Sequence, residues 1–248
     1  MILLLDAGNT RIKWGVRQAG VWLARGVLPT SEAGRLGGSW AAFPLRAALL
    51  SCVAGPETRS TLETMLTPRV ALLHWLRAAV DAHGVHSDYQ PADSLGSDRF
   101  AALVAAGRRK LGACLVVNVG TAMTVDALTA AGRFLGGCIV PGPELMRSIL
   151  LRGTAQVREA DATAGQGSGL PRSTDAAVAT GIALALAGAV AGMRERLLRD
   201  GGETVTLLLS GGARSILDGL LEPPLLEVDD LVLEGLVWIA KDLKWEDC

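Results

Sequence analysis

The chain has 248 residues, half of them hydrophobic, with a formal net charge of −1 and an isoelectric point near 6.3. A chain of this length and apolar content can bury a large core, in one large domain or two small ones. The charge is balanced and no dense cluster of lysine and arginine occurs, so we expect no nucleic-acid partner.

The cysteines and the N-terminus favour a cytoplasmic protein. The cysteines lack CxxC spacing, which favours reduced core thiols over zinc ligands or disulfides. They are Cys52, Cys114, Cys138 and Cys248. The apolar residues 1–5 end at Asp6 and lack the basic region and cleavage site of a signal peptide.

One uncharged segment, residues 176–193, is long enough to be considered as a membrane span. Its residues are mostly alanine, glycine and threonine, which gain little free energy from lipid. We therefore expect no membrane partner, and interpret the segment as a helix buried in the core or in a subunit interface.

Hydrophobic alternation predicts mainly strands in the first third of the chain. Strands are expected at residues 2–5, 11–17, 21–28, 47–53 and 70–76. A helix between the last two begins with a capping-box pattern, Ser60-Thr61-Leu62-Glu63. Trp14, Trp22 and Trp75 lie within the strand patterns and are expected in the core.

The pattern starts again after Pro91 with a helix at residues 100–110, capped by Ser97 or Asp98. Further strands are expected at 115–119, 123–128, 134–140 and 205–210, and further helices at 175–199 and 213–221. Residues 3–10 can be laid over residues 115–122, since both read as an apolar strand followed by a polar residue, a glycine and small polar residues. This internal duplication predicts two similar α/β halves, residues 1–95 and 96–248, with a cleft between them.

Three turns of small residues are candidates for binding phosphate or nucleotide. Glycines let the backbone approach an anion, and free N–H groups and hydroxyls can bond phosphate oxygens. An acid at the end of the first strand can hold Mg²⁺ through water. The turns are Asp6-Ala7-Gly8-Asn9-Thr10 with Lys13, Gly120-Thr121-Ala122, and Ser210-Gly211-Gly212-Ala213. Each alone is more often a plain connection, but their order predicts a nucleotide clamped between two related domains. No Walker A loop or G-x-G-x-x-G fingerprint is present.

Asp98 has two interpretations. It can simply cap the helix that follows, or it can be a general base that accepts the proton of a substrate hydroxyl attacking a γ-phosphate. In the second case Arg99 offers a fork for a substrate carboxylate. The pair Asp229-Asp230 is interpreted as a solvated turn rather than a metal site.

Taken together, these motifs resemble the type III pantothenate kinases of the acetate and sugar kinase/Hsp70/actin superfamily, over nearly the whole chain. Residues 6–10 with Lys13 resemble the first phosphate motif, and residues 120–126 the second. Tyr89 with residues 95–99 resembles the pantothenate segment, and residues 210–212 the adenosine motif.

The resemblance implies two related actin-like, ribonuclease H-like halves with mixed sheets, and a cytoplasmic homodimer that phosphorylates pantothenate with ATP and Mg²⁺. It implies that Asp98 accepts the proton and that Asp6 positions Mg²⁺ through water. The nucleotide would contact Asp6, Ala7, Gly8, Asn9, Thr10, Arg11, Ile12, Lys13, Gly120, Thr121, Ser210, Gly211 and Gly212. Pantothenate would contact Tyr89, Gly96, Ser97, Asp98, Arg99 and Thr174.

Two positions depart from the family pattern. Asn118 stands where the family usually has an aspartate that binds a monovalent cation, so the need for K⁺ or NH₄⁺ is open. Ser87-Asp88 replaces an Asn-Gly pair before Tyr89 and adds a negative charge near an anionic substrate. Two alternative functions are another small-molecule kinase of the superfamily and a non-catalytic regulatory accessory protein.

Overall fold

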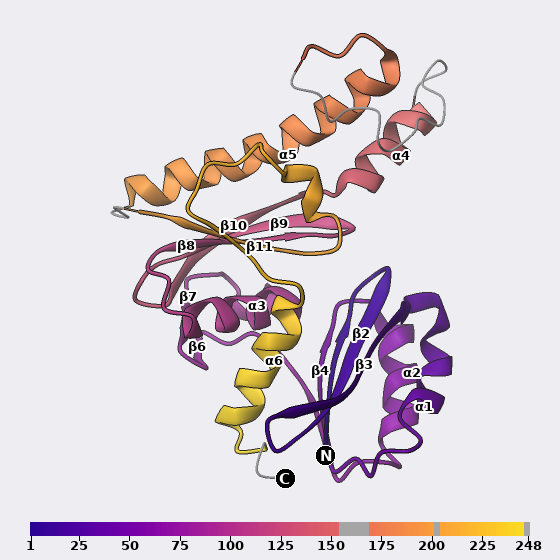
Figure 1. The fold of residues 1–248 in the computed structure, drawn as a ribbon. Helices are drawn as coiled ribbons and strands as arrows, with labels where there is room; N and C mark the ends of the chain where they lie inside the picture. The colour runs from indigo at the N-terminus through magenta and orange to yellow at the C-terminus, as the bar shows by residue number, and fades with distance from the viewer. Residues whose placement is uncertain (154–168, 201–203, 246–248) are drawn as a thin grey trace. The chain divides into compact units, whose positions relative to one another are not determined.

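The structure is a computed structural model that describes residues 1–153, 169–200 and 204–245. The chain forms two compact units, coloured along the chain in Figure 1. The first contains residues 1–111, 130–136 and 230–248, and the second residues 112–129 and 137–229. These compact units divide the chain differently from the sequence segments 1–95 and 96–248, because residues 96–111 and the C-terminal helix pack within the first unit. The division into two duplicated segments at residue 95 stays a prediction.

A five-stranded sheet forms the centre of the first unit, in the order β3-β2-β1-β4-β5. Strand β1 is antiparallel to β2 and parallel to β4. The strands are β1 (Ile2–Ala7), β2 (Arg11–Gln18), β3 (Val21–Pro29), β4 (Ala47–Cys52) and β5 (Leu72–Trp75). All five predicted strands are therefore confirmed. Trp14 is buried as expected, whereas Trp22 and Trp75 are half-buried with arginine side chains over their rings.

The remaining elements of the first unit are short strands and helices. They are the 3-10 helices η1 (Thr30–Arg35) and η2 (Ala92–Ser94), the strands β6 (Asp81–Ala82) and β7 (Val85–Ser87), and the helices α1 (Leu36–Ser39), α2 (Pro56–Leu66), α3 (Ser97–Arg108) and α6 (Leu231–Asp242). The capping-box prediction for α2 was wrong. Pro56, which has no N–H to satisfy, opens the helix after Gly55, so Ser60 lies inside it.

Helices α3 and α6 pack closely against each other in the first unit (Figure 1). Gly235 of α6 lies against the carbonyl oxygen of Ala101, and a Cβ at this glycine would collide with that oxygen. Helix α6 also contacts β1, β2 and β4. The close glycine contact therefore fixes α6 beside the strands that carry the first phosphate motif.

The second unit repeats the strand arrangement of the first. Its strands are β8 (Cys114–Val119), β9 (Ala122–Leu128), β10 (Arg133–Pro141), β11 (Thr206–Ser210) and β12 (Leu225–Glu227). Their order, β10-β9-β8-β11-β12, matches β3-β2-β1-β4-β5 strand for strand. Strand β8 is antiparallel to β9 and parallel to β11, as β1 is to β2 and β4. The duplicated fold predicted from residues 3–10 and 115–122 is therefore confirmed. Strand β7 pairs with Arg133 and Phe134, which begin β10 and belong to the first unit.

Two helices and a short 3-10 helix complete the described part of the second unit. They are α4 (Pro143–Gly153), α5 (Thr174–Arg199) and η3 (Arg214–Leu217). Helix α5 contacts β8 and β9 (Figure 1). The helix predicted at residues 213–221 is wrong: only four residues form η3, and Gly219 adopts a positive φ of 70° that a helix does not permit.

Helix α5 is long and apolar enough to be considered as a membrane span, with a mean hydropathy of 1.9 in its most apolar window. Only 22% of that window is buried in the chain. The expectation of a core helix was therefore wrong, and the subunit-interface alternative stays a prediction. Cys52, Cys114 and Cys138 are free thiols, of which Cys114 is buried, while Cys248 lies outside the described residues.

Candidate nucleotide and substrate site

The first predicted phosphate motif forms the tight turn between β1 and β2. The N–H of Gly8 donates to the carbonyl of Arg11 at 3.0 Å, and the Thr30 hydroxyl donates to the Gly8 carbonyl at 2.7 Å. Ala7 and Ile12 are buried in the core, so only their backbone can face a ligand. Asn9, Thr10 and Arg11 are exposed at the tip of the turn. Lys13 lies opposite Asp6 in the β1–β2 ladder.

Asp6 carries the most unusual electrostatics in this turn. Burial and, next, the charge of nearby Asp98 raise the pKa of its carboxyl to about 7, although Lys13 and a hydrogen bond from Ser51 partly oppose that rise. Its Oδ1 atom is buried and has no hydrogen-bond partner among the described residues. Mg²⁺ and its bound waters take carboxylate oxygens as ligands. An unpaired oxygen of this kind fits a magnesium site.

A pair of buried serines links Asp6 to the start of α3, and sequence reasoning missed one of them. The Ser51 and Ser97 hydroxyl oxygens lie 3.0 Å apart, and the N–H of Cys52 donates to Ser97 Oγ at 3.2 Å. Because Ser51 donates its one proton to Asp6, it accepts from Ser97. Ser97, predicted as a substrate contact, here joins α3 to β4. Residue type gave no signal for Ser51, because only the fold brings β4 beside β1.

Asp98 is the second residue of α3, and its side chain is half-buried. The N-cap position is occupied by Gly96, with no side-chain hydrogen bond capping it, so the prediction that Ser97 or Asp98 is the N-cap was wrong. Asp98 Oδ1 accepts the N–H of Arg99 at 2.8 Å. Burial raises the pKa of Asp98, and its interactions with Arg99 partly oppose that shift. The carboxylate is thus held by the first turn of the helix and made more basic by burial.

The predicted substrate residues Tyr89 and Arg99 lie together with Phe134, which sequence reasoning missed. The Tyr89 and Phe134 rings are stacked, with centroids 5.7 Å apart. Arg99 Cζ lies 5.3 Å from the centre of the tyrosine ring and 5.9 Å from that of the phenylalanine. Arg99 is buried, and Phe134 is fully buried beneath the cluster. Two aromatic faces thus orient a single guanidinium.

The unusual Ser87-Asp88 pair is accommodated by its neighbours. Ser87 is buried, and its hydroxyl oxygen accepts the N–H of Tyr89 at 3.2 Å. Asp88 pairs with Arg133, whose Nε lies 2.8 Å from its carboxylate. The arginine offsets the extra negative charge that this departure from the family pattern introduces.

In the second unit the other two predicted motifs lie at the ends of neighbouring parallel strands. Residues 120–121 follow β8 and residues 211–212 follow β11, and Asn118 pairs with Ser210 in the ladder between them. Gly211 has a φ of 99°, and a Cβ there would collide with the backbone of Val119. In open α/β sheets, ligands bind outside the carboxyl ends of the strands. The structure therefore brings these two motifs together.

Arg214 secures the Ser210-Gly211-Gly212 turn, a role that sequence reasoning missed. Its guanidinium donates to the Gly211 carbonyl at 3.3 Å, to Glu227 at 2.8 Å and to Asp229 at 2.7 Å. The two acidic partners raise the pKa of Arg214, and the hydrogen bond to Glu227 contributes most. The turn is thereby tied to the end of β12.

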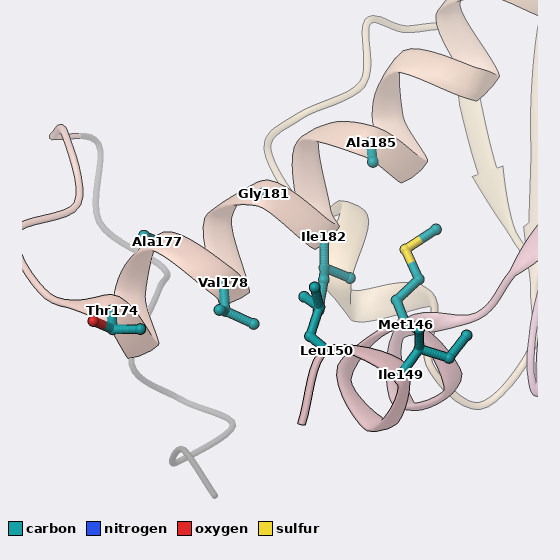
Figure 2. Close-up of a pocket in the computed structure, with 9 residues that line it drawn as sticks. All are labelled: Met146, Ile149, Leu150, Thr174, Ala177, Val178, Gly181, Ile182 and Ala185. Carbon is teal, nitrogen blue, oxygen red and sulfur yellow. The ribbon is translucent and has the colours of Figure 1, made fainter. Parts of the chain in front are cut away.

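Thr174 lies apart from the phosphate motifs of the second unit, at the start of α5. It lines a pocket of about 560 Å³ between α4 and α5 (Figure 2). The rest of the lining is apolar: Met146, Ile149, Leu150, Ala177, Val178, Gly181, Ile182 and Ala185. Gly120, Thr121 and Ser210 do not line it, so the pocket is not the predicted phosphate site.

Comparison with known proteins gives a consistent family. Residues 2–196 match the family model of the type III pantothenate kinases. A type III pantothenate kinase from Aromatoleum aromaticum is 42% identical over 243 residues, with 98% of each chain covered. Another from Nitrosomonas eutropha is also 42% identical, with 97% of this chain and 94% of the relative covered.

Solved structures with low identity show the fold. A Campylobacter jejuni protein described as a Baf family transcriptional activator has a TM-score of 0.64 at 18% identity, with 98% of each chain covered. MreB 5 of Spiroplasma citri bound to AMPPNP has a TM-score of 0.54 at 12% identity, with 98% of this chain and 96% of that chain covered. The fold is therefore actin-like, as expected from the sequence.

Proposed function

Because the chain belongs to the type III pantothenate kinase family, we propose that it transfers the γ-phosphoryl group of ATP to pantothenate. The product would be 4′-phosphopantothenate, the first intermediate of coenzyme A synthesis. The observation that carries this proposal is the family match over residues 2–196, joined to a half-buried Asp98 of raised pKa beside the Arg99–Tyr89 cluster. The curated relatives reported above are pantothenate kinases, and they support neither alternative function.

Asp98 is the proposed general base. The primary hydroxyl of pantothenate loses its proton to the carboxylate while its oxygen attacks the γ-phosphorus, and ADP leaves. A raised pKa suits this task, because a more basic carboxylate accepts the proton more readily. The hydrogen bond from the Arg99 N–H is made to Oδ1, so we propose that the substrate hydroxyl approaches Oδ2.

Arg99 and Tyr89 are the proposed anchors of the pantothenate carboxylate. A guanidinium presents a planar fork of donors that matches a carboxylate. The stacked rings of Tyr89 and Phe134 pack against that guanidinium. Its side chain therefore loses little conformational entropy when the substrate binds. Gly96 and Ser97 would shape the same end of α3, and Thr174 would contact pantothenate from the start of α5.

The nucleotide is proposed to contact the three turns. Gly8, Asn9, Thr10, Lys13, Gly120 and Thr121 would bind the phosphates, with Ala7, Arg11 and Ile12 contributing backbone groups, and residues 210–212 would contact adenosine. A divalent metal accompanies ATP in a kinase of this family, and Asp6 would hold Mg²⁺ through water. When bound, Mg²⁺ would neutralise the charge that develops on the phosphates.

The proposal also includes a monovalent-cation site, a homodimeric assembly and a cytoplasmic location. The Asn118 side-chain oxygen would coordinate K⁺ or NH₄⁺ without a full negative charge, so activation by these ions would be weak. The exposed apolar surface of α5 supports a homodimer interface, because large exposed apolar areas in a chain commonly mark association sites. We place the enzyme in the cytoplasm, where its proposed substrates occur.

An ADP-release assay tests the proposal. Purified protein with MgATP should release ADP only when pantothenate is added, in parallel buffers containing K⁺, NH₄⁺ or Na⁺. A panel of other hydroxylated small molecules serves as the specificity control. Release with a different hydroxylated substrate, and none with pantothenate, would overturn the assignment.

A further inference from the structure

Asp230 bridges two cations from neighbouring strands of the first unit. Its Oδ1 atom lies 2.7 Å from Lys13 Nζ, and its Oδ2 atom lies 2.5 Å from Arg25 Nη2. The side chains of Asp230 and Lys13 are only 26% and 32% exposed. The sequence interpretation of a solvated Asp229-Asp230 turn therefore holds for Asp229, which is 85% exposed, but is wrong for Asp230.

Helix packing, and not the carboxylate itself, sets the place of Asp230. It is the residue before α6, and that helix is fixed on α3 by the close contact of Gly235 with Ala101. A carboxylate at this position commonly bonds the free N–H groups of its own helix. Asp230 makes no such cap bond and instead reaches the two cations.

Lys13 has a second acidic neighbour, Asp6. Which of the two carboxylates the lysine contacts therefore affects whether Asp6 can hold a metal. Lys13 faces Asp6 across the β1–β2 ladder, and its charge lowers the pKa of Asp6, whereas Asp230 raises it. A lysine side chain is long and loses rotamer freedom when it is held. Without Asp230, the ammonium would be drawn toward Asp6 and would occupy the oxygen available for a metal.

One bond to Asp230 also leaves Lys13 able to bind a ligand. An ammonium group has three N–H donors, so one on Asp230 leaves two for phosphate oxygens. Arg25 fixes the other oxygen of the carboxylate, and its own guanidinium lies 4.9 Å from the centre of the Trp22 ring. Trp22 in turn packs over Gly15 of β2, where a Cβ would lie only 2.7 Å from ring atom Cε3.

We propose that Asp230 is a positioning residue that holds the Lys13 ammonium away from Asp6 and in the orientation that binds ATP phosphates, with Arg25 steadying its carboxylate. This inference rests on the proposed role of Lys13 as a phosphate ligand. Asp230 itself touches neither ATP nor pantothenate in this scheme.

A double-mutant cycle on MgATP affinity tests the inference. The proteins are the wild type, Asp230→Asn, Lys13→Met and the double variant, with affinity measured from the MgATP-induced shift of the thermal midpoint. Asp230→Asn should weaken MgATP affinity about fivefold and should add nothing in the Lys13→Met background, because coupled residues are not additive. Asp230→Glu, which keeps the charge, should lie closer to the wild type.

Asp242→Asn is the matched control, because Asp242 is the last residue of α6, the helix that Asp230 precedes, and also bridges two partners, Arg108 and His83. It should leave MgATP affinity unchanged in both backgrounds. Equal weakening by Asp230→Asn with and without Lys13 would overturn the inference, as would tighter binding of MgATP by Asp230→Asn. A wild-type protein that binds MgATP but does not phosphorylate pantothenate would overturn the proposed function alone, since the binding cycle would still report the coupling.

Discussion

The Asp98 carboxylate lies so close to the Cα atom of Gly96 that only glycine fits at position 96. A Cβ at position 96 would lie 2.6 Å from Asp98 Oδ1, so the carboxylate occupies the space that any other residue would fill. The carboxylate thereby stays within reach of the Arg99 N–H.

This relationship predicts that Gly96→Ala will displace the general base. We expect kcat to fall between about tenfold and a hundredfold, because small displacements of a reacting group are costly. The backbone angles at position 96 suit alanine, so the thermal midpoint should change little. Gly34→Ala is the control, since a Cβ there meets no atom within 4 Å. An unchanged kcat in Gly96→Ala would contradict the account.

The Ser51–Ser97 hydrogen bond predicts a stabilising role for Ser51. Replacing it by alanine leaves the Ser97 hydroxyl without its buried acceptor, and this should reduce the free energy of unfolding by about 1–3 kcal/mol. Denaturant unfolding measures the change. The control is Thr64→Ala, whose hydroxyl makes an exposed bond to the Ser60 carbonyl and whose removal should cost below about 0.5 kcal/mol. Equal losses in the two variants would refute the buried bond.

The pKa of Asp6 predicts how the stability of the metal-free protein depends on pH. The folded carboxyl keeps its proton up to about pH 7, whereas an unperturbed one loses it near 3.8. Because the folded-state pKa is raised, this contribution to stability is fully present below 3.8 and is lost as the pH rises through 7. In a chelating buffer the thermal midpoint should therefore fall as the pH rises from about 4 to about 7, and Asp6→Asn should flatten that fall. A wild-type profile that is already flat would argue against the buried, protonated carboxyl.

A substitution at Phe134 should affect the KM for pantothenate and the KM for ATP differently. Phe134→Leu removes the ring stacked on Tyr89, and should raise KM for pantothenate about fivefold while leaving KM for ATP unchanged. Phe43→Leu, at a partly buried phenylalanine packed against the core of the first unit, controls for general loosening. A parallel rise in both KM values would show that Phe134 acts only through stability.

The residue at position 118 should determine how strongly activity depends on the monovalent cation. Asn118→Asp adds a full negative charge at the end of β8, so the ratio of activity in K⁺ to activity in Na⁺ should rise above that of the wild type. Initial rates in matched ionic strength measure it. A ratio that does not change would exclude residue 118 from cation binding.

Local sequence patterns predicted much of the fold, because strand alternation and the matched turns at residues 3–10 and 115–122 are local features. Helix α6 escaped prediction because eight of its 12 residues are buried, so its apolar residues follow no single helical face. The α2 boundary was misplaced because Pro56 outweighs a capping-box pattern at Ser60.

The residues of the candidate site likewise include some that the sequence predicts and some that it does not. Motif residues such as Asp6 and Asp98 can be identified from the chain, since their turns carry a recognisable order. Ser51, Phe134 and Asp230 could not, because each contributes through a contact made by strand pairing or helix packing between distant segments.

The most direct test of the central claim is product identification by phosphorus NMR with the wild type and Asp98→Asn. The wild type with MgATP and pantothenate should yield the phosphomonoester signal of 4′-phosphopantothenate in step with ADP. Asp98→Asn should bind MgATP and unfold at a similar temperature, yet form product at least about a hundredfold more slowly. Formation of the same product by Asp98→Asn at the wild-type rate would contradict the account.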